Sequence, residues 1–285
     1  MKRIVFQGEP GAYSHLSAHE HFPDWEPVPC ATFEDALAAI ASGDAELGMI
    51  PIENSVAGRV ADIHHLLPQS ELYIVGERFL RVRHQLLGVP GAEVSDLKIV
   101  RSHTMALGQC RTVIRALNLL PEVAADTAGA ARQVAAAGDP SVGAIASSLA
   151  AKIYNLDILQ TDIEDHEANT TRFLLMANEP DDAEPDTDDV ITSLLFRVRN
   201  VPAALYKALG GFATNAVNVT KLESYQLEGT FSATQFYADI EGHPDDRSVR
   251  LALEELKFFT TTMRVLGVYP ADPAREDLRG EPVKS

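Results

Sequence analysis

A stretch of 19 residues occurs twice in this chain, and this internal repeat constrains the fold more than any other feature. Residues 32–50 read TFEDALAAIASGDAELGMI, and residues 127–145, which begin 95 positions later, read TAGAARQVAAAGDPSVGAI. Seven of the 19 aligned positions are identical, including Gly48 with Gly143. In both copies a helical pattern stops at a glycine and a short apolar strand pattern follows. The repeat predicts two lobes of related α/β topology.

The elements around the first copy fit this fold class. We expect strands at 2–6 and 47–50, and a helix at 33–42 with Thr32 as its N-cap and Asp35 completing a weaker capping box. The strand at 98–100 begins the second lobe as the strand at 4–6 begins the first. Because open α/β sheets bind ligands at the carboxyl ends of their strands, both lobes should face a shared cleft.

The charge of the chain is unevenly distributed. The 285 residues correspond to about two domains and carry a formal net charge of -17. Residues 1–178 hold 22 acids and 13 bases, residues 179–189 hold 7 acids and no base, and residues 190–285 hold 12 acids and 11 bases. Nucleic-acid binding needs a basic surface, so we do not expect it. Five bases, together with Arg172, are expected to supply a local positive field for an anion: Arg78, Arg81, Arg83, Lys98 and Arg101.

The sequence contains no clear signal for membrane insertion, export or metal binding. No run approaches the ~20 apolar residues of a membrane span, and the first nine residues turn polar after three apolar ones. Two cysteines, Cys30 and Cys110, form neither a disulfide framework nor a metal-ligand spacing. We therefore expect a cytoplasmic protein without membrane attachment, metal or cofactor.

The last third of the chain reads as a separate unit. The acidic segment 179–189 contains two prolines and is expected to be a solvated linker. Strands at 191–199, 215–225, 231–240 and 263–269, with helices at 202–212 and 245–259, give the order βαββαβ of a ferredoxin-like unit. Pro202 is expected at the first helical position, Glu228-Gly229 at the turn between the two central strands, and a loose tail beyond 270.

Two polar clusters follow strands of the first lobe. In residues 8–14, GEPGAYS, the glycines permit a tight turn and Ser14 can cap a helix, although a simple βα turn explains the pattern equally well. Residues 51–58, PIENSVAG, place a carboxylate, an amide and a hydroxyl within one turn. A helix cap built from Asn54 or Ser55 is the competing explanation.

Two further clusters lie next to strands later in the chain. Ser102 is a natural N-cap with Gln109 about two turns later, and Ser147 occupies the corresponding place after the strand 142–146. Arg172 lies at the start of an apolar strand in NTTRFLL, where its guanidinium suits a carboxylate and Thr171 offers a hydroxyl. A structural ion pair of Arg172 with Asp165 or Glu167 is the alternative.

Other candidates carry less weight. His64, His65, His84, His103 and His166 could each act as a base, but cap or surface roles are favoured. The sequence has no dinucleotide fingerprint, no phosphate-binding loop and no nucleophile elbow, so neither a nucleotide site nor a hydrolase triad is supported.

Taken together, GEPGAYS, PIENSVAG, RSHTMALGQC and NTTRF, in this order, resemble the prephenate dehydratases with a C-terminal ACT domain. The likeness covers nearly the whole chain, and the ACT pattern is carried by VPAALYKAL and TKLESYQLEG. The resemblance implies a two-lobed domain like the type II periplasmic-binding proteins at 1–178, the lobes being roughly 1–78 with 170–178, and 79–169. It further implies a linker at 179–189, a regulatory ACT domain at 190–270 and a tail at 271–285.

The resemblance also implies an activity, the conversion of prephenate to phenylpyruvate, CO2 and water in phenylalanine biosynthesis. Thr171 is then the catalytic residue. The implied substrate-binding positions are Glu53, Asn54, Ser102, Gln109 and Arg172, with Ser14 and Ser147 as additions. Arg172 and helix N–H groups are expected to hold one carboxylate of the dianion, and Thr171 to hydrogen-bond the leaving hydroxyl.

Feedback inhibition by phenylalanine at a dimer or tetramer interface of ACT domains is implied as well. The implied effector residues are Ala203, Ala204, Leu205, Asn218, Glu223 and Ser224. The family pattern Gly-Ala-Leu-Val here begins with alanine at Ala203, and Glu-Ser-Arg-Pro reads Glu-Ser-Tyr-Gln at 223–226. These departures from the family pattern are expected to affect how strongly phenylalanine inhibits the enzyme.

Three other functions are compatible with the same sequence. An arogenate dehydratase, or a dehydratase acting on both substrates, would use similar residues. A non-catalytic solute-binding protein would share the two-lobed cleft, and a purely regulatory amino-acid sensor would share the ACT pattern. Product formation from prephenate or arogenate separates these alternatives.

Overall fold

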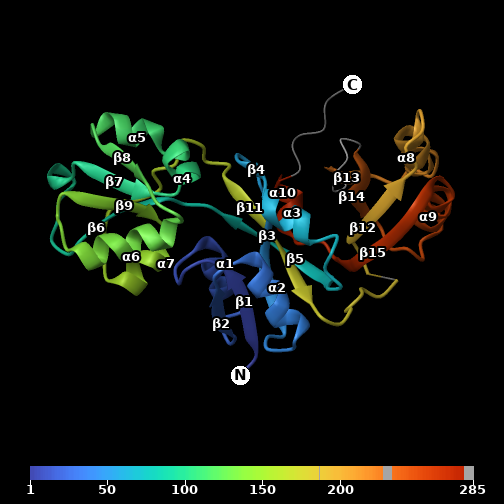
Figure 1. Cartoon of the computed structure of the whole chain (residues 1–285), viewed down its shortest axis with the longest axis horizontal. Helices are drawn as coiled ribbons and strands as arrows, with labels where there is room; N and C mark the ends of the chain where they lie inside the picture. The colour runs from blue at the N-terminus through green and yellow to red at the C-terminus, as the bar shows by residue number, and fades with distance from the viewer. Residues whose placement is uncertain (186, 227–232, 279–285) are drawn as a thin grey trace. The chain divides into compact units, whose positions relative to one another are not determined.

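The computed structural model describes residues 1–185, 187–226 and 233–278 (Figure 1). Contacts divide the chain into two units. The first contains residues 1–63 and 78–173, and the second contains residues 64–77 and 174–285. The expected boundary at 178 thus lies close to a contact boundary, but segment 64–77 groups with the C-terminal unit.

The first lobe of the first unit, blue in Figure 1 except for β5 in teal and β11 in yellow, is built on a sheet with the strand order β2-β1-β3-β11-β5, with β4 paired to β3. Its central strands β1 and β3 are parallel, as the alternation of strands and helices predicts. The elements are β1 (Arg3–Gln7), α1 (Tyr13–His21), β2 (Glu26–Cys30), α2 (Phe33–Ala41), β3 (Leu47–Asn54), β4 (Gly58–Arg59), α3 (Ala61–Leu66), β5 (Tyr73–Arg81) and β11 (Thr170–Ala177).

The second lobe, green in Figure 1, has the order β10-β6-β9-β7-β8. Strands β7, β8 and β9 are parallel to one another, and β6 is antiparallel to β9 and β10. The elements are β6 (Gln85–Gly88), the 3₁₀ turn η1 (Val94–Asp96), β7 (Ile99–Ser102), α4 (Thr104–Gln109), α5 (Arg111–Ala116), β8 (Leu120–Val123), α6 (Thr127–Ala137), β9 (Val142–Ala146), α7 (Ser148–Tyr154) and β10 (Asp157–Gln160).

The repeat read from the sequence is a repeat of structure. Val5 pairs with Gly48 between β1 and β3, and Val100 pairs with Gly143 between β7 and β9. Each glycine lies where an added methyl group would collide with its own lobe, with Ile40 in the first case and the Leu87 carbonyl in the second. The prediction of two lobes of related topology is confirmed.

The helix starts confirm one prediction and correct two. The Thr32 hydroxyl accepts from Asp35 N–H and the Asp35 carboxylate accepts from Thr32 N–H, so the capping box at α2 is present. Ser14 is not a cap, because α1 begins at Tyr13 with Ala12 in the cap position. Ser102 ends β7, and the N-cap of α4 is His103, whose Nδ1 accepts from Met105 N–H.

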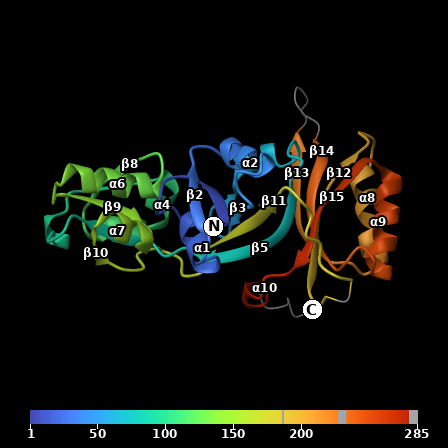
Figure 2. The same cartoon turned by 90° about the horizontal axis from the view of Figure 1, so that it is seen from below.

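The C-terminal unit contains an antiparallel sheet with the order β13-β14-β12-β15, and α8 and α9 cover one face of it (Figure 2). This is the predicted ferredoxin-like arrangement, in which the first and third strands are central. The elements are β12 (Val190–Val198), α8 (Ala204–Thr214), β13 (Val219–Gln226), β14 (Ala233–Glu241), α9 (Arg247–Phe259), β15 (Thr260–Pro270) and α10 (Ala274–Leu278).

Three expectations for this unit need correction, and a fourth lies outside the described residues. Helix α8 begins at Ala204, so Pro202 precedes the helix instead of opening it. The tail beyond 270 contains the helix α10, whose Arg275 forms an ion pair with buried Glu77. The acidic segment is not fully solvated, because Ala183 N–H donates to the Val268 carbonyl. The turn at Glu228-Gly229 lies outside the described residues.

The second face of this sheet is covered by segment 64–77. Arg264 donates to the carbonyls of Ser70 and Leu72, and a methyl group on Gly267 would collide with the Ile74 carbonyl. Polar side chains are buried beneath the segment: Asp239 accepts from Ser193 and Tyr237, while His64 Nδ1 lies 2.7 Å from the Tyr225 hydroxyl. Both faces of the sheet are therefore packed.

Candidate active site

Strand β3 continues beyond its apolar core and carries the PIEN residues to the site. The sequence places a strand end at Ile50, but β3 runs to Asn54 and pairs Glu53 with Arg59 and Asn54 with Gly58 of β4. Pairing with β4 extends the ladder, which is why the polar residues stay in strand conformation. The PIEN cluster is thus part of a strand and not a loop after it.

Asn54 is held by the backbone of the turn that follows it. Its Oδ1 accepts from Val56 N–H at 3.0 Å and from Ala57 N–H at 2.8 Å. Its Nδ2 donates to Thr171 Oγ1 at 2.9 Å and to Asn169 Oδ1 at 2.7 Å. The alternative of a helix cap at Asn54 is wrong, because the side chain closes an Asx turn. Asn54 and Thr171, two predicted site residues, are in direct contact.

Gln109 joins the same cluster from the end of α4. Its Oε1 accepts from Asn169 Nδ2 at 3.1 Å and lies 2.9 Å from His84 Nε2. The other nitrogen of His84 lies 2.7 Å from the Tyr13 hydroxyl. We call Asn54, Thr171, Asn169, Gln109, His84 and Tyr13 the amide cluster.

Glu53 and Arg172 form a second, adjoining pair. Arg172 Nη1 donates to Glu53 Oε1 at 3.0 Å, and the arginine side chain is 3% exposed while that of the glutamate is 32% exposed. The structure thus pairs Arg172 with another predicted site residue. Asp165 accepts from the N–H groups of Arg111 and Thr112. A buried arginine needs such a partner to offset its desolvation.

The three predicted serines do not join the amide cluster. The Ser102 hydroxyl donates to the Ile145 carbonyl at 2.6 Å and is fully buried. The Ser147 hydroxyl donates to the Gly11 carbonyl and accepts from Ala150 N–H as the cap of α7. Ser14 is buried within α1. The substrate contacts expected of these serines stay predictions.

The amide cluster includes three residues that were not predicted as site residues. Asn169 and Tyr13 belong to the motifs NTTRF and GEPGAYS, so their place in those motifs was an available signal. The sequence indicates His84 only as a weak candidate base, because a single histidine before an apolar strand belongs to no recognisable motif. Their common property, mutual hydrogen bonding, is a product of the tertiary structure.

Burial shifts the pKa values of three groups here. Desolvation lowers the pKa of His84, which is 2% exposed, so the imidazole is neutral at neutral pH. Desolvation also raises the pKa of the Tyr13 hydroxyl, an effect that the charges of Cys110, Glu164 and Asp162 reinforce. The pKa of the Cys110 thiol is raised by burial, so this cysteine is no thiolate nucleophile.

The basic residues expected to create a positive field are mostly paired. Arg81 lies 4.0 Å from Glu164, Arg83 lies 3.1 Å from Asp162, and Arg101 lies 2.6 Å from Glu122. Each ion pair has no net charge, so its field falls off faster with distance than that of a single charge. These three arginines therefore add little to the expected local positive field, which stays a prediction.

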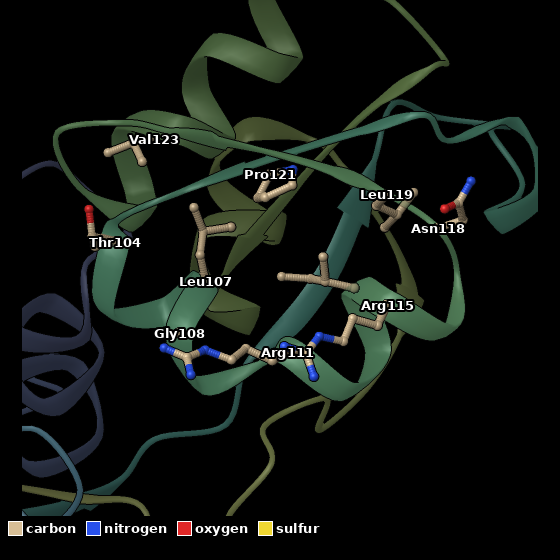
Figure 3. A pocket seen from close by; sticks show the side chains of 10 residues that line it. Thr104, Leu107, Gly108, Arg111, Arg115, Asn118, Leu119, Pro121 and Val123 are labelled. Atoms are coloured by element: carbon tan, nitrogen blue, oxygen red, sulfur yellow. The ribbon is translucent and has the colours of Figure 1, made fainter.

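A separate cavity of about 550 Å³ lies in the second lobe between α4, α5 and β8 (Figure 3). Leu107, Ile114 and Leu119 contribute apolar lining, and Arg111 and Arg115 line it as well. The α4 residues that line it, Thr104, Leu107 and Gly108, occupy positions i, i+3 and i+4 of one helix face. Gln109 projects from a different face, so the cavity is distinct from the amide cluster.

The described part of the chain contains neither a candidate membrane helix nor a candidate metal cluster. None of its helices is long and apolar enough to cross a membrane. Over residues 1–185, 187–226 and 233–278, no group of three His, Cys, Asp or Glu side chains could hold a metal ion.

The sequence profile of the prephenate dehydratases matches residues 4–181, more than half of the chain and all of the amide cluster. The chain belongs to the prephenate dehydratase family. The resemblance seen in the motifs is thus confirmed, and the protein is an enzyme of the hydro-lyase class.

Known members of the prephenate dehydratase family resemble the chain over nearly its full length. A bifunctional N-acyl-homoserine lactone acylase/prephenate dehydratase from Komagataeibacter europaeus is 51% identical, with 95% of this chain and 97% of that protein aligned. An arogenate dehydratase/prephenate dehydratase from Arabidopsis thaliana is 40% identical over 95% of this chain and 73% of its own. The structure of the Arthrobacter aurescens prephenate dehydratase in complex with L-Phe is 29% identical, with a TM-score of 0.86 over 94% of this chain and 89% of that chain.

Proposed function

We propose that this chain converts prephenate to phenylpyruvate in phenylalanine biosynthesis. The dianion takes up one proton and yields the phenylpyruvate monoanion, CO2 and water. The bond between the ring and its carboxylate breaks, its electron pair moves into the ring, and the C–O bond to the ring hydroxyl breaks. Because the ring becomes aromatic, the enzyme needs mainly to orient the substrate and assist the leaving hydroxide.

The observation that carries this proposal is the hydrogen bond from Asn54 Nδ2 to Thr171 Oγ1. Asn54 Oδ1 is occupied by two backbone N–H groups, which cannot act as acceptors, so the Asn54 amide can only donate to Thr171. The Thr171 oxygen therefore accepts from Asn54, and its own hydrogen is directed elsewhere. A hydroxyl held in this way is a donor suited to a leaving hydroxyl group.

Arg172 and Glu53 supply the electrostatic part of the proposed site. The Thr171 hydroxyl carries no charge at neutral pH, so the proposed carboxylate ligand is the planar guanidinium of Arg172, which binds a carboxylate through directed hydrogen bonds even though Glu53 offsets its charge. Arg172 follows Thr171 directly, and Glu53 holds its guanidinium in place. We assign one substrate carboxylate to Arg172 with the helix N–H groups, and the remaining contacts to Glu53, Ser102, Gln109, Ser14 and Ser147 as proposed substrate-binding residues.

The test is spectroscopic detection of phenylpyruvate from prephenate. Thr171→Ala should lower kcat by about 10² or more because the donor to the leaving hydroxyl is lost. Thr171→Ser should recover much of the rate. Thr170→Ala is the matched control, since the side chain of Thr170 makes no hydrogen bond within the described residues, and it should retain wild-type turnover. Wild-type turnover in Thr171→Ala would remove Thr171 from the reaction.

The preference between prephenate and arogenate is tested with both substrates. Relatives carry names for either activity, and arogenate differs by an amino group in place of the keto oxygen. We propose prephenate as the main substrate, because the relative with 51% identity is named for it. A larger kcat/KM for arogenate would reverse this assignment.

We also propose inhibition by phenylalanine through the ACT-type unit, assembled as a homodimer or tetramer. A solved relative is a complex with L-Phe. The proposed effector residues have defined places: Ala203 precedes α8, Ala204 and Leu205 open it, Asn218 Nδ2 donates to Glu241, Glu223 lies 3.3 Å from Lys221 Nζ, and Ser224 is exposed on β13.

Ala203 allows a specific test of this regulation. Its φ is 61°, in the left-handed region that glycine adopts without strain, and the family pattern has glycine there. Ala203→Gly should raise the free energy of unfolding by about 1 kcal/mol and lower the phenylalanine concentration for half-inhibition. A flat phenylalanine response in both proteins, with an unchanged sedimentation coefficient, would leave the unit as a dimerisation module.

A second candidate activity is deacylation of N-acyl-homoserine lactones. It is favoured by one observation, the name of the relative with 51% identity over nearly the full length of both chains. Release of the fatty acid from a short-chain N-acyl-homoserine lactone would support it. Absence of release at enzyme concentrations that turn over prephenate would assign this chain to the dehydratase activity alone.

A further inference from the structure

The amide cluster has a single consistent hydrogen-bond orientation, and its origin is the backbone. Val56 N–H and Ala57 N–H can only donate, so Asn54 must present Oδ1 to them and Nδ2 to its other partners. Asn54 Nδ2 faces Asn169, which must therefore present its oxygen to Asn54 and its nitrogen to Gln109. The backbone N–H groups of Val56 and Ala57, which cannot rotate, thus fix the orientations of the Asn54 and Asn169 amides.

The same argument continues to the histidine. Gln109 faces the Asn169 nitrogen, so Gln109 must present Oε1, and that oxygen also lies 2.9 Å from His84 Nε2. An oxygen requires a donor, so Nε2 carries the hydrogen. In the neutral imidazole Nδ1 is then an acceptor, and the Tyr13 hydroxyl at 2.7 Å donates to it in preference to the Arg83 carbonyl, which lies farther away at 3.1 Å.

The alternative tautomer would satisfy Tyr13, whose hydroxyl could then donate to the Arg83 carbonyl, but it conflicts with the amide orientations at Gln109 and Asn169. With its hydrogen on Nδ1, His84 would turn a lone pair toward Gln109 Oε1. A flip of the Gln109 amide would relieve that contact but would bring two NH2 groups together at Asn169. The orientation of Gln109 and the tautomer of His84 are therefore coupled.

We propose that His84 is a positioning residue that fixes the Gln109 amide so that its Nε2–H donors face the substrate. The proposal rests on the proposed dehydratase function and deepens it. Gln109 Nε2 and the Thr171 hydroxyl donate to no residue in the described part of the chain, so the network leaves these two donors for the reacting molecule. His84 itself is 2% exposed and acts through Gln109.

The first test measures the tautomer without any substrate. In full-length protein labelled with ¹⁵N-histidine, long-range ¹H–¹⁵N correlations at pH 7.5 should show His84 with its hydrogen on Nε2. Tyr13→Phe removes the donor to Nδ1 and should shift the histidine toward a mixture of tautomers. A wild-type histidine carrying its hydrogen on Nδ1 would overturn the proposal. This measurement decides the proposal even if the wild type fails to form phenylpyruvate.

The second test is a kinetic double-mutant cycle. His84→Leu should lower kcat/KM by about tenfold to 100-fold, because Gln109 loses the bond that orients it. In a Gln109→Ala background the same change should cost less than about threefold. His84→Gln keeps a donor near the Nε2 position and should restore part of the rate, while His21→Leu, a partly buried histidine outside the network, is the control.

Two results would contradict the positioning role. Equal losses from His84→Leu in both backgrounds would show that the histidine does not act through Gln109. A fall in the thermal unfolding temperature of His84→Gln that accounts for its loss of activity would assign His84 to folding. The predicted result is near wild-type unfolding of His84→Gln together with non-additive kinetics.

Discussion

The two lobes of the catalytic unit share a strand order and differ at the ends of corresponding strands. In both, the third strand pairs with the first through an equivalent glycine, Gly48 or Gly143. Strand β3 is eight residues long and ends in Glu53-Asn54, whereas β9 is five residues long and is followed by the cap Ser147 and α7. The two copies of the repeat are therefore alike in the middle of the strands and differ at the strand ends.

This difference shows where chemistry was added to a common scaffold. Residues in the middle of β3 and β9 face packing constraints that admit few side chains. The ends of the strands carry no such constraint, so polar residues can accumulate there at little cost in stability. The hairpin of β3 with β4 made room for Asn54, while the second lobe contributes Gln109 and His84 from other elements.

The largest expected effect compares the two strand ends directly. Asn54→Ala removes the donor to Thr171 and the anchor of Asn169, and should lower kcat/KM by about 10² or more. Ser147→Ala, at the end of β9, removes a helix cap and a buried hydrogen bond. It should lower the free energy of unfolding by about 1–3 kcal/mol and, because Ser147 is only one of several proposed substrate contacts, lower kcat/KM by much less than Asn54→Ala does.

Steady-state kinetics and urea unfolding of both variants measure this comparison. A severe loss of turnover in Ser147→Ala with unchanged stability would show that both strand ends bind substrate. It would also support the substrate contact predicted for Ser147.

The next effect compares the paired glycines. A methyl group on Gly143 would lie 2.9 Å from the Leu87 carbonyl oxygen, and one on Gly48 would meet the end of the Ile40 side chain. Backbone cannot yield as a side-chain tip can, so Gly143→Ala should destabilise by about 2–3 kcal/mol and Gly48→Ala by about 1 kcal/mol.

Ile40→Val in the Gly48→Ala background is the matched test, read from urea denaturation. It removes the atom that collides and should restore part of the loss. Equal destabilisation by the two alanines, with no rescue, would show that the clash at Ile40 does not set the cost at Gly48.

A smaller effect compares the N-caps of the repeated helices. The Thr32 hydroxyl accepts from Asp35 N–H at α2, and the Asp126 carboxylate accepts from Gly129 N–H at α6. Thr32→Ala and Asp126→Ala should each lower the free energy of unfolding by about 1 kcal/mol. Thermal denaturation of both variants measures this. A cost near zero at either site would break the parallel between the helices.

The smallest effect is a pH dependence shared by the two lobes. Burial lowers the pKa of His15 in α1 and of His84 before β6 from the ordinary value of 6.5. Between that value and the lowered one the unfolded chain binds more protons than the folded chain, so stability should fall as the pH falls below about 6.5. Urea midpoints from pH 7.5 to 5 should decline less in His15→Gln and His84→Gln than in the wild type. An unchanged slope would contradict this.

Much of the fold was readable from local patterns. The repeat at 32–50 and 127–145 predicted the two lobes because glycine stops and apolar strands are local signals of sequence. The capping box at Thr32 was predicted for the same reason. The end of β3 was missed, because residues 51–54 are held as a strand by β4, and a pairing partner cannot be read from the strand alone.

Some features of the candidate site were likewise predicted from local sequence, and others were not. Asn54, Gln109 and Thr171 came from motifs, and the structure brings them together. Ser14 and Ser102 look like caps in sequence, but the observed caps are Ala12, two residues before Ser14, and His103, one residue after Ser102. The basic cluster looked like a positive field because its acidic partners, Asp162 and Glu164, lie about 80 residues away in the chain.

By itself, the sequence determined the family, the two-lobed α/β architecture, the ferredoxin-like unit and the residue types of the site. These follow from periodicity, turn residues and motifs, which act within a few neighbouring residues. Only the tertiary structure decided which polar atoms meet. The orientation of Gln109 depends on backbone N–H groups at 56 and 57, on Asn169 and on His84, which long-range folding brings within about 3 Å of one another. Hydrogen bonds have direction and short range, so their network exists only once those segments are packed.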